Sequence, residues 1–416
     1  MESKSETIDQ SLSEEDYGLP FFYNVISVVK RQCSRFQHYK WNIIEKGSIK
    51  TPQSERRNFS LELIDSALSQ IKKHIVTTKC TKSSFLSNTE NKTPIKIFIK
   101  DEAFQSMGSV KTRGVIYTLL QLSDAQREKG VIAASTGSFA TILCHYGHEL
   151  NVPVTVVMPK SAATEDLNFC QSIAARCKTN RCPSCVKKQI KVITRGNMTA
   201  AFKLALHIAK EDGLYYLDGN DNPDMIIGQA TMGLELINQL SDIDAVILPT
   251  IIDGCGLTTG IATVIRERNP NIRYVFEVQP EVIDCLVENI RNEDDLLHKW
   301  GISEIKYPWY QDLNYPKAGH WFDETVKPNQ KEVDKYADVF KTYLKNDSIK
   351  PYVAVALFQL LHDIKYKDKL KRVVICQFGK IDSSKDLTDK PSSERCTACS
   401  LHNYGTLVRA RPANMS

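Results

Sequence analysis

Apolar residues recur with two different periods along the middle of this chain. Between Leu61 and Ile75 they return every three or four residues, a spacing that places their side chains on one face of a helix. From residue 95 onward, short apolar and β-branched runs alternate with longer helical stretches. The runs predicted as strands are 95–100, 131–134, 154–158, 190–193, 245–249, 274–278 and 373–376. This alternation predicts an α/β fold with mostly parallel, twisted sheets flanked by helices.

Helices are predicted between and after these strands. They span about 139–150, 162–175, 199–210, 226–240, 333–344 and 352–364, and a further helix opens at Leu257. In parallel sheets the ligand lies at the carboxyl ends of the strands. Four loops mark that edge here: the segment around Lys111, the turn 135–138, the loop 253–256 and the residues after Cys376.

The two ends of the chain differ from its middle. Residues 1–57 are polar and weakly periodic and are predicted to form an extension with little core of its own, and residues 383–416 a polar C-terminal tail. The segment 300–329 is rich in Trp, Tyr, Pro and Gly and is predicted to be a long surface connection.

Composition excludes several classes of protein. The chain has 416 residues, 42% hydrophobic and 25% charged, as in ordinary globular proteins. A net charge of +5, without a stripe of Lys and Arg interleaved with aromatic residues, argues against a nucleic-acid binder. No apolar run approaches the length of a membrane span. The acidic, polar N-terminus is unlike a secretory signal, so we expect a cytoplasmic protein.

The segment Ser109–Gly114 carries the most reactive chemistry. It places Lys111 between a strand and a buried helical stretch that starts near Val115. A lysine that loses water in such a position attacks carbonyl groups as a free amine. The alternative is an ordinary surface lysine near the start of a helix.

Two further loops offer binding groups. In Asp253–Leu257, glycines lead into a helix N-terminus, where free backbone N–H groups bind phosphate. The alternative is a tight turn between a strand and a helix. Asp253 favours this alternative, because its carboxylate would repel a phosphate group. The hydroxyls of the turn 135–138 can hydrogen-bond a ring substituent or a substrate carboxylate. The alternative there is helix capping by Ser138 or a neighbour.

Twelve cysteines in a reducing compartment are more often thiols or metal ligands than disulfides. Cys170, Cys177, Cys182 and Cys185 form a local cluster with one C-x-x-C pair. Four thiols can bind zinc tetrahedrally. The alternative is a cysteine-bearing surface insertion.

Taken together, these blocks resemble the fold-type-II pyridoxal-phosphate enzymes, which share the fold of the tryptophan synthase β-subunit, and specifically their serine/threonine dehydratase and serine racemase branch. Ser109–Gly114 is similar to that family's G-S-F-K-x-R-G, whose lysine binds the cofactor covalently. The segment 130–138 is similar to G-V-x-A-x-S-A-G-N, and 221–231 to D-x-P-x-x-I-x-G-Q-G-T. Residues 254–261 are similar to the glycine loop that binds the phosphate. The likeness covers about 58–382 and implies a smaller subdomain, about 105–212, inserted in a larger one.

The resemblance implies roles for individual residues. Lys111 and Thr136 would be catalytic, Thr136 lying where racemases carry a serine. The cofactor, pyridoxal 5'-phosphate, would be held by Lys111, Ser138, Gly254, Cys255, Gly256, Leu257 and Gln377. Ser138 replaces an asparagine and Gln377 replaces a serine that partners the pyridine nitrogen. Gln279 stands near a carboxylate that some members use as a metal ligand, so no such metal site is predicted.

The resemblance implies a pyridoxal-phosphate-dependent ammonia-lyase that converts L-serine or L-threonine to a 2-oxo acid and ammonia, and a homodimer. Two alternatives remain open. One is a protein that keeps the fold but has lost turnover and has a binding or regulatory role, as the altered cofactor contacts suggest. The other is a β-replacement enzyme of the cysteine synthase or cystathionine synthase type, which Leu257–Gly260 would also fit.

Overall fold

The computed structural model describes most of the predicted folded region. The described residues are 60–87, 95–135, 137–179, 190–219, 222–249, 256–278, 321–329, 331–333, 349–366 and 368–379. The predicted N-terminal extension 1–57, the tail 383–416 and nearly all of the predicted helix 333–344 lie outside them.

Six strands form the larger sheet, in the order β1-β2-β10-β7-β8-β9. Every pairing is parallel except that of the edge strand β1 with β2. The strands span Cys80–Lys82 (β1), Lys96–Asp101 (β2), Ala245–Pro249 (β7), Tyr274–Val278 (β8), Glu324–Val326 (β9) and Arg372–Gln377 (β10). One face packs on α15 (Pro351–His362) and the other on α10 (Pro223–Gln239) and α11 (Gly256–Arg268).

Four parallel strands form the smaller sheet, in the order β5-β4-β3-β6. They are Val131–Ala134 (β3), Val154–Met158 (β4), Ile190–Thr194 (β5) and Tyr215–Tyr216 (β6). One face packs on α7 (Ser138–Glu149) and α8 (Thr164–Thr179), and the other on α9 (Met198–Asp212). The mostly parallel α/β fold predicted from the sequence is therefore confirmed.

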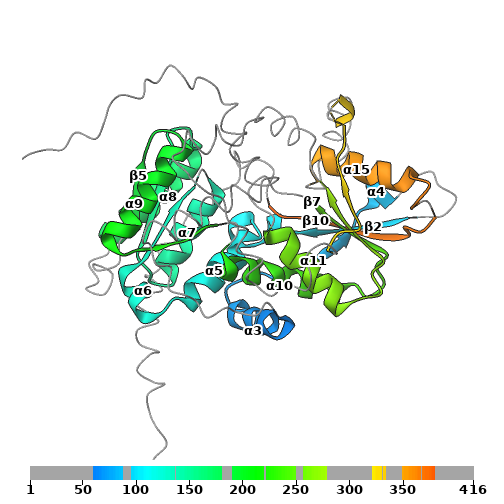
Figure 1. Cartoon of the computed structure of the whole chain (residues 1–416), viewed down its shortest axis with the longest axis horizontal. Coiled ribbons are helices and arrows are strands. Elements are labelled where there is room, and N and C mark those ends of the chain that lie inside the picture. The colour runs from blue at the N-terminus through cyan, green and yellow to red at the C-terminus, as the bar shows by residue number, and fades with distance from the viewer. Residues whose placement is uncertain are drawn as a thin grey trace, which may run out of the picture.

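Two central helices, α5 (Lys111–Gln121) and α10, lie between the lobes that contain the two sheets (Figure 1). They approach so closely that a Cβ atom on Gly228 would lie only 2.6 Å from the backbone oxygen of Arg113. The lack of a side chain at Gly228 permits this approach. Asn222 caps α10 by accepting hydrogen bonds from the N–H groups of Asp224 and Met225. Helix α3 (Leu61–Ile71) packs beside them and confirms the helical period read from that segment.

The chain departs from the sequence prediction in short elements. The strands β1 and β6 have only three and two residues, too few for a periodic signal. Strand β9 lies inside the segment predicted as a surface connection, where it extends the edge of the sheet beside β8. The short helix α6 (Asp124–Lys129) between α5 and β3 was not predicted, although Ser123 and Gln126 form a capping box at its start.

Candidate active site

Lys111 is the first residue of α5. Two short 3-10 turns, Glu102–Phe104 and Ser106–Gly108, lead to it from β2. The helix thus begins four residues earlier than the sequence predicted, and the lysine belongs to the helix. The residue is only 8% exposed, so the surface-lysine alternative is wrong.

The loop before Lys111 is fastened to the end of β10. The N–H of Val110 donates to the carbonyl of Phe378 at 2.9 Å, and Ser109 forms an isolated antiparallel bridge with Gly379. The hydroxyl of Ser109 accepts a hydrogen bond from the N–H of Lys111 at 3.2 Å. The predicted lysine loop and the predicted loop after Cys376 therefore meet in space.

An aromatic ring from the other lobe covers the lysine. The Lys111 Nζ atom lies 5.8 Å from the centre of the Phe139 ring, on the first turn of α7. The ring is held close to Gly219, where a Cβ atom would lie 2.6 Å from its Cδ1 atom. A glycine is therefore required at 219 if Phe139 is to face the amine.

A helix N-terminus packs in the same apolar cluster as Val110, the residue before the lysine. Helix α11 starts at Gly256, which is buried, and Leu257 shares an apolar cluster with Val110, the residue before Lys111. The N–H groups of a first helical turn lack partners within the helix and attract anions. Gly254 and Cys255 of the predicted phosphate loop lie outside the described residues, so their role stays a prediction.

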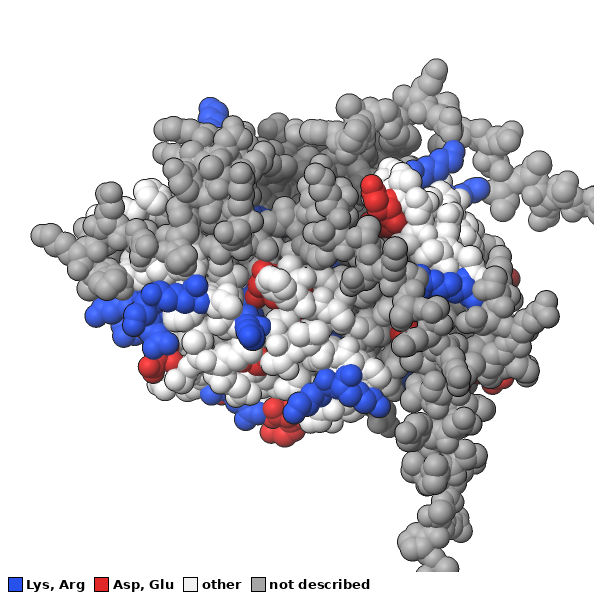
Figure 2. Space-filling model, turned by 180° about the vertical axis from the view of Figure 1, so that it is seen from behind, with Lys and Arg blue, Asp and Glu red and all other residues white. Residues whose placement is uncertain are grey.

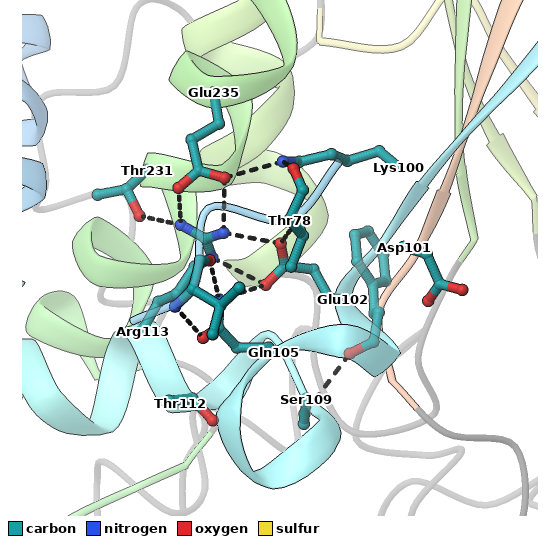
Figure 3. A network of polar contacts seen from close by, with 12 residues as sticks. Thr78, Lys100, Asp101, Glu102, Gln105, Ser109, Thr112, Arg113, Thr231 and Glu235 are labelled. Atoms are coloured by element: carbon teal, nitrogen blue, oxygen red, sulfur yellow. Dashed lines mark hydrogen bonds and ion pairs between the residues drawn. The ribbon is translucent and has the colours of Figure 1, made fainter. Parts of the chain in front are cut away.

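Arg113, two residues after Lys111, belongs to a buried network of charges (Figure 3). Arg113 donates to both oxygens of Glu102 at 2.8 Å, and to the two oxygens of Glu235 at 2.7 and 2.8 Å. Lys100 Nζ donates to Glu235 at 2.8 Å and to the carbonyl of Thr78 at 2.6 Å. Two positive and two negative side chains are thus buried together, which removes the cost of burying an unpaired charge.

The network shifts the pKa values of Glu102 and Arg113. Burial favours the neutral form of Glu102, but the charge of Arg113 and the hydrogen bonds from Arg113 and Thr78 outweigh it and hold the pKa of this carboxyl below its usual value. For Arg113, burial lowers the pKa, yet the attraction of Glu102 and Glu235 raises it overall. Both of these charges are fixed at neutral pH, so the first turn of α5 has a rigid support.

The turn after β3 holds another predicted set of residues. Ser138 is exposed at the start of α7, and the Ser135 hydroxyl accepts a hydrogen bond from the Gly137 N–H at 3.4 Å. The alternative of helix capping by Ser138 or a neighbour is wrong, because the N-cap is Gly137 and no side chain makes a capping hydrogen bond there. Thr136 is not among the described residues, and its catalytic role stays a prediction.

Gln377, predicted to partner a pyridine nitrogen, is buried at the end of β10. Its amide Nε2 donates to the carbonyl of Gly379 at 2.7 Å. The Nε2 end of the Gln377 side chain is therefore bound to its own loop. Its Oε1 atom is the group that would face the pyridine ring.

The predicted zinc cluster is described in part. Cys170 is buried in the apolar core of the smaller lobe. Cys177 lies further along α8, its side chain is not described, and Cys182 and Cys185 fall in the segment 180–189, outside the described residues. Among the described residues no group of three or more His, Cys, Asp or Glu side chains is placed to hold a metal. Zinc binding by the four cysteines stays a prediction.

On the face seen in Figure 2, the Lys and Arg side chains of the described residues lie in several separate groups, with Asp or Glu beside some of them. Within the described part of the chain, no helix is both long and apolar enough to cross a membrane.

A buried lysine at a helix start, in a loop hydrogen-bonded to the carboxyl end of a strand of a mostly parallel sheet, matches the site expected of a fold-type-II pyridoxal-phosphate enzyme. Residues 71–331 match the sequence profile of the pyridoxal-phosphate dependent enzymes. The chain belongs to this family.

Two relatives show which branch is similar. An L-threonine ammonia-lyase from Thermotoga maritima is 28% identical over 332 residues, covering 78% of this chain and 76% of that protein. A catabolic L-threonine dehydratase from Staphylococcus aureus is 30% identical over 281 residues, covering 66% of this chain and 75% of that protein.

Solved structures share the fold. Maize serine racemase aligns with a TM-score of 0.59 at 18% identity, covering 84% of this chain and 98% of that one. The processed form of threonine deaminase isoform 2 from Solanum lycopersicum aligns with a TM-score of 0.57 at 22% identity, covering 84% of this chain and 94% of that one. The predicted resemblance to the dehydratases is confirmed by the two relatives, and the serine racemase structure shows a shared fold.

The family's cofactor fits the described residues. The amine of Lys111 would bind it covalently, the first turn of α11 would hold its phosphate, and Gln377 would face its ring. Sequence reasoning missed Phe139 and Gly219, because they lie far apart in the chain and only their contact relates them to the lysine. It also missed Glu102 and Glu235, whose importance depends on their common partner Arg113.

Proposed function

We propose that the chain is a pyridoxal-phosphate-dependent ammonia-lyase that converts L-serine or L-threonine to a 2-oxo acid and ammonia. The observation that carries this proposal is Lys111, which is intact, buried and covered by the Phe139 ring. The similarity to an ammonia-lyase at 28% identity and to a dehydratase at 30% identity supports the reaction.

The chain's own residues supply the proton chemistry. The cofactor, when bound, withdraws electrons from the substrate Cα atom. Lys111 Nζ holds the cofactor before the substrate arrives and then removes the proton from Cα. Phe139 keeps water from one side of the amine, and the ion pairs of Arg113 hold the helix that carries it. Thr136 lies outside the described residues, and from the sequence we propose that it binds the substrate carboxylate or takes part in a second proton transfer.

Absorbance and product formation test the proposal. Full-length protein mixed with pyridoxal phosphate should gain an absorbance at wavelengths well beyond those that the protein itself absorbs, as expected for a covalently bound cofactor. Lys111→Ala should lose it, while Lys203→Ala, on the exposed face of α9, should retain it. L-serine or L-threonine should then yield 2-oxo acid and ammonia. Absorbance that is equal in both variants would contradict the role of Lys111.

A second candidate is a binding protein without turnover. The observation that favours it is Gln377, whose amide is engaged with Gly379. Retained cofactor absorbance with no product from any hydroxy amino acid would support this candidate. Product that forms only when a thiol is added would instead support the β-replacement alternative.

We also propose a cytoplasmic homodimer with a smaller subdomain near 105–212. The smaller sheet, built from residues between 131 and 216, supports the subdomain. Val76 and Phe104 support an interface: both are exposed, Phe104 by 74%, and two hydrogen bonds between Gln105 and the backbone of Val76 bring them together. In light scattering, Phe104→Glu should reduce the mass of a wild-type dimer to that of a monomer.

A further inference from the structure

Helix α7 contacts the loop before Lys111 through the hydroxyl of Tyr146. The Tyr146 hydroxyl lies 2.8 Å from the hydroxyl of Ser106, and either oxygen can donate the hydrogen bond between them. Ser106 begins the second 3-10 turn after β2. The hydrogen bond therefore joins a helix that covers the smaller sheet to a turn that follows a strand of the larger sheet.

The backbone of Ser106 extends this contact to the first turn of α5. Its carbonyl accepts a hydrogen bond from the Thr112 hydroxyl at 2.7 Å, and its N–H donates to Oε1 of Gln105 at 3.0 Å. Thr112 is the residue after Lys111, and its side chain is fully buried. Tyr146 is thus linked, through Ser106 alone, to the helical turn that carries the reactive amine.

The residue that follows Ser106 has a disfavoured backbone conformation. Met107 has a φ of 64°, in the left-handed region, and Gly108 after it has a φ of 67°. A side chain is disfavoured at such a φ because its Cβ atom crowds the next carbonyl oxygen, so the conformation persists only where neighbouring contacts hold it. The hydrogen bonds of Ser106 hold the chain immediately before this strained residue.

Tyr146 and Phe139 lie on one face of α7. The seven residues between them correspond to about two helical turns. Both side chains are buried in the same apolar cluster, and Phe139 is the ring that lies 5.8 Å from Lys111 Nζ. Burial raises the pKa of the Tyr146 phenol above its usual value, so the hydroxyl keeps its proton at neutral pH. One face of α7 therefore supplies both the ring beside the amine and the hydroxyl that holds the loop before it.

We infer that Tyr146 is a positioning residue for Lys111. Through Ser106 it holds the strained turn before the lysine, and this keeps the amine beside the Phe139 ring. The inference rests on the proposed function for the reaction in which the amine takes part. The position of the amine itself can be measured without cofactor or substrate.

The test measures how fast Lys111 reacts with a water-soluble amine reagent in the full-length protein without cofactor, with peptide mass spectrometry as the readout. Tyr146→Phe removes the hydroxyl and keeps the ring. Ser106→Ala removes the same hydrogen bond from the other side. The double variant shows whether the two hydroxyls act as a pair, because the effects of paired groups are not additive.

Two internal controls separate a local change from a general loss of stability. Tyr366→Phe removes another buried phenol hydroxyl, which is bonded to Glu324 on the edge strand β9 of the larger sheet. The labelling rate of Lys100, which is fully buried, reports global unfolding in every variant. The quantity compared is therefore the ratio of the Lys111 rate to the Lys100 rate.

We expect Tyr146→Phe to raise this ratio about three- to tenfold, where tenfold corresponds to roughly 1.4 kcal/mol, the upper range for one hydrogen bond. Ser106→Ala should raise it similarly, the double variant should go no further than the larger single effect, and Tyr366→Phe should leave it unchanged. An unchanged ratio beside a lowered melting temperature would overturn the inference, because Tyr146 would then only stabilise the fold. A double effect equal to the product of the two single effects would also overturn it.

Turnover provides a separate readout. With pyridoxal phosphate bound, Tyr146→Phe should lower kcat for L-serine or L-threonine by about three- to tenfold and change KM by less than about twofold, because a displaced amine slows proton removal more than it weakens substrate binding. A raised KM with an unchanged kcat would contradict the positioning role. A shifted labelling ratio in a protein whose wild type forms no 2-oxo acid would retain the inference about Lys111 and reject the ammonia-lyase reaction.

Discussion

Arg113 and Glu102 form a bidentate ion pair in which neither side chain is exposed. The Arg113 Nε atom lies 2.8 Å from Oε2 of Glu102, and its Nη2 atom lies 2.8 Å from Oε1. Arg113 is two residues beyond Lys111, so the pair connects the first turn of α5 to the 3-10 turn that follows β2 (Figure 3). The reactive lysine is thus positioned by a salt bridge that it does not itself join.

Loss of this pair should destabilise the protein strongly. Glu102→Gln leaves the Arg113 guanidinium with one carboxylate instead of two, and breaking a buried pair costs about 3–5 kcal/mol. Urea unfolding at pH 7 measures the change in the free energy of unfolding. The control is Asp65→Asn, which removes the exposed ion pair with Arg268 and should cost less than about 1 kcal/mol. Equal costs for the two variants would contradict a structural role for the buried network.

The contribution of Glu102 should depend on pH. The folded-state pKa of Glu102 is lowered, because the interactions with Arg113 and Thr78 outweigh the effect of burial. A glutamate in the unfolded chain has a pKa of about 4.3. The stabilisation is therefore fully present above about pH 4.3 and is lost as the pH falls through the folded-state pKa. The difference in unfolding free energy between wild type and Glu102→Gln should be constant from pH 7 to about 5 and shrink below about 4. If the difference in unfolding free energy between wild type and Glu102→Gln grew as the pH fell, the predicted direction of the pH dependence would be wrong.

The contact between α5 and α10 should not tolerate a side chain at Gly228. A Cβ atom there would lie 2.6 Å from the backbone oxygen of Arg113 and 2.7 Å from the Cα atom of Gly114. We expect Gly228→Ala to cost about 1–3 kcal/mol, because backbone atoms cannot move aside as side chains do. Gly233→Ala, on the same helix, meets the Val264 side chain at 3.1 Å and should cost less. Thermal unfolding of both variants measures the difference.

The contact between Gly219 and Phe139 should control access to the lysine. Gly219→Ala places a Cβ atom 2.6 Å from the Phe139 ring, and the ring must shift. We expect faster labelling of Lys111 by a water-soluble amine reagent, measured by peptide mass spectrometry in the absence of cofactor, at a stability cost of about 1–3 kcal/mol. Labelling of the exposed Lys203 should stay unchanged and controls for the reagent, whereas faster labelling of the fully buried Lys100 would report general unfolding. Slower labelling of Lys111 would mean that the ring does not cover it.

The sequence by itself determined the strands and helices of the core. Runs such as 154–158 and 245–249 are apolar throughout or nearly so because parallel strands are covered on both faces, and this pattern is local enough to be read directly. The order of the motifs at Lys111, 130–138 and 221–231 also determined the family, because each motif is a contiguous segment.

Only the tertiary structure decided how the site is assembled. Several contacts join residues that are separated in the chain and meet only through the packing of different elements. They are Phe139 with Gly219, Arg113 with Glu235, and Gly137 with Asp166. No spacing rule relates such residues. Hydrophobic periodicity predicts which face of a helix or strand is buried, but it does not predict which residue of another element that face contacts. The sequence therefore determined which residues are candidates for the reaction, and the packing decided which residues surround them and set their charge environment.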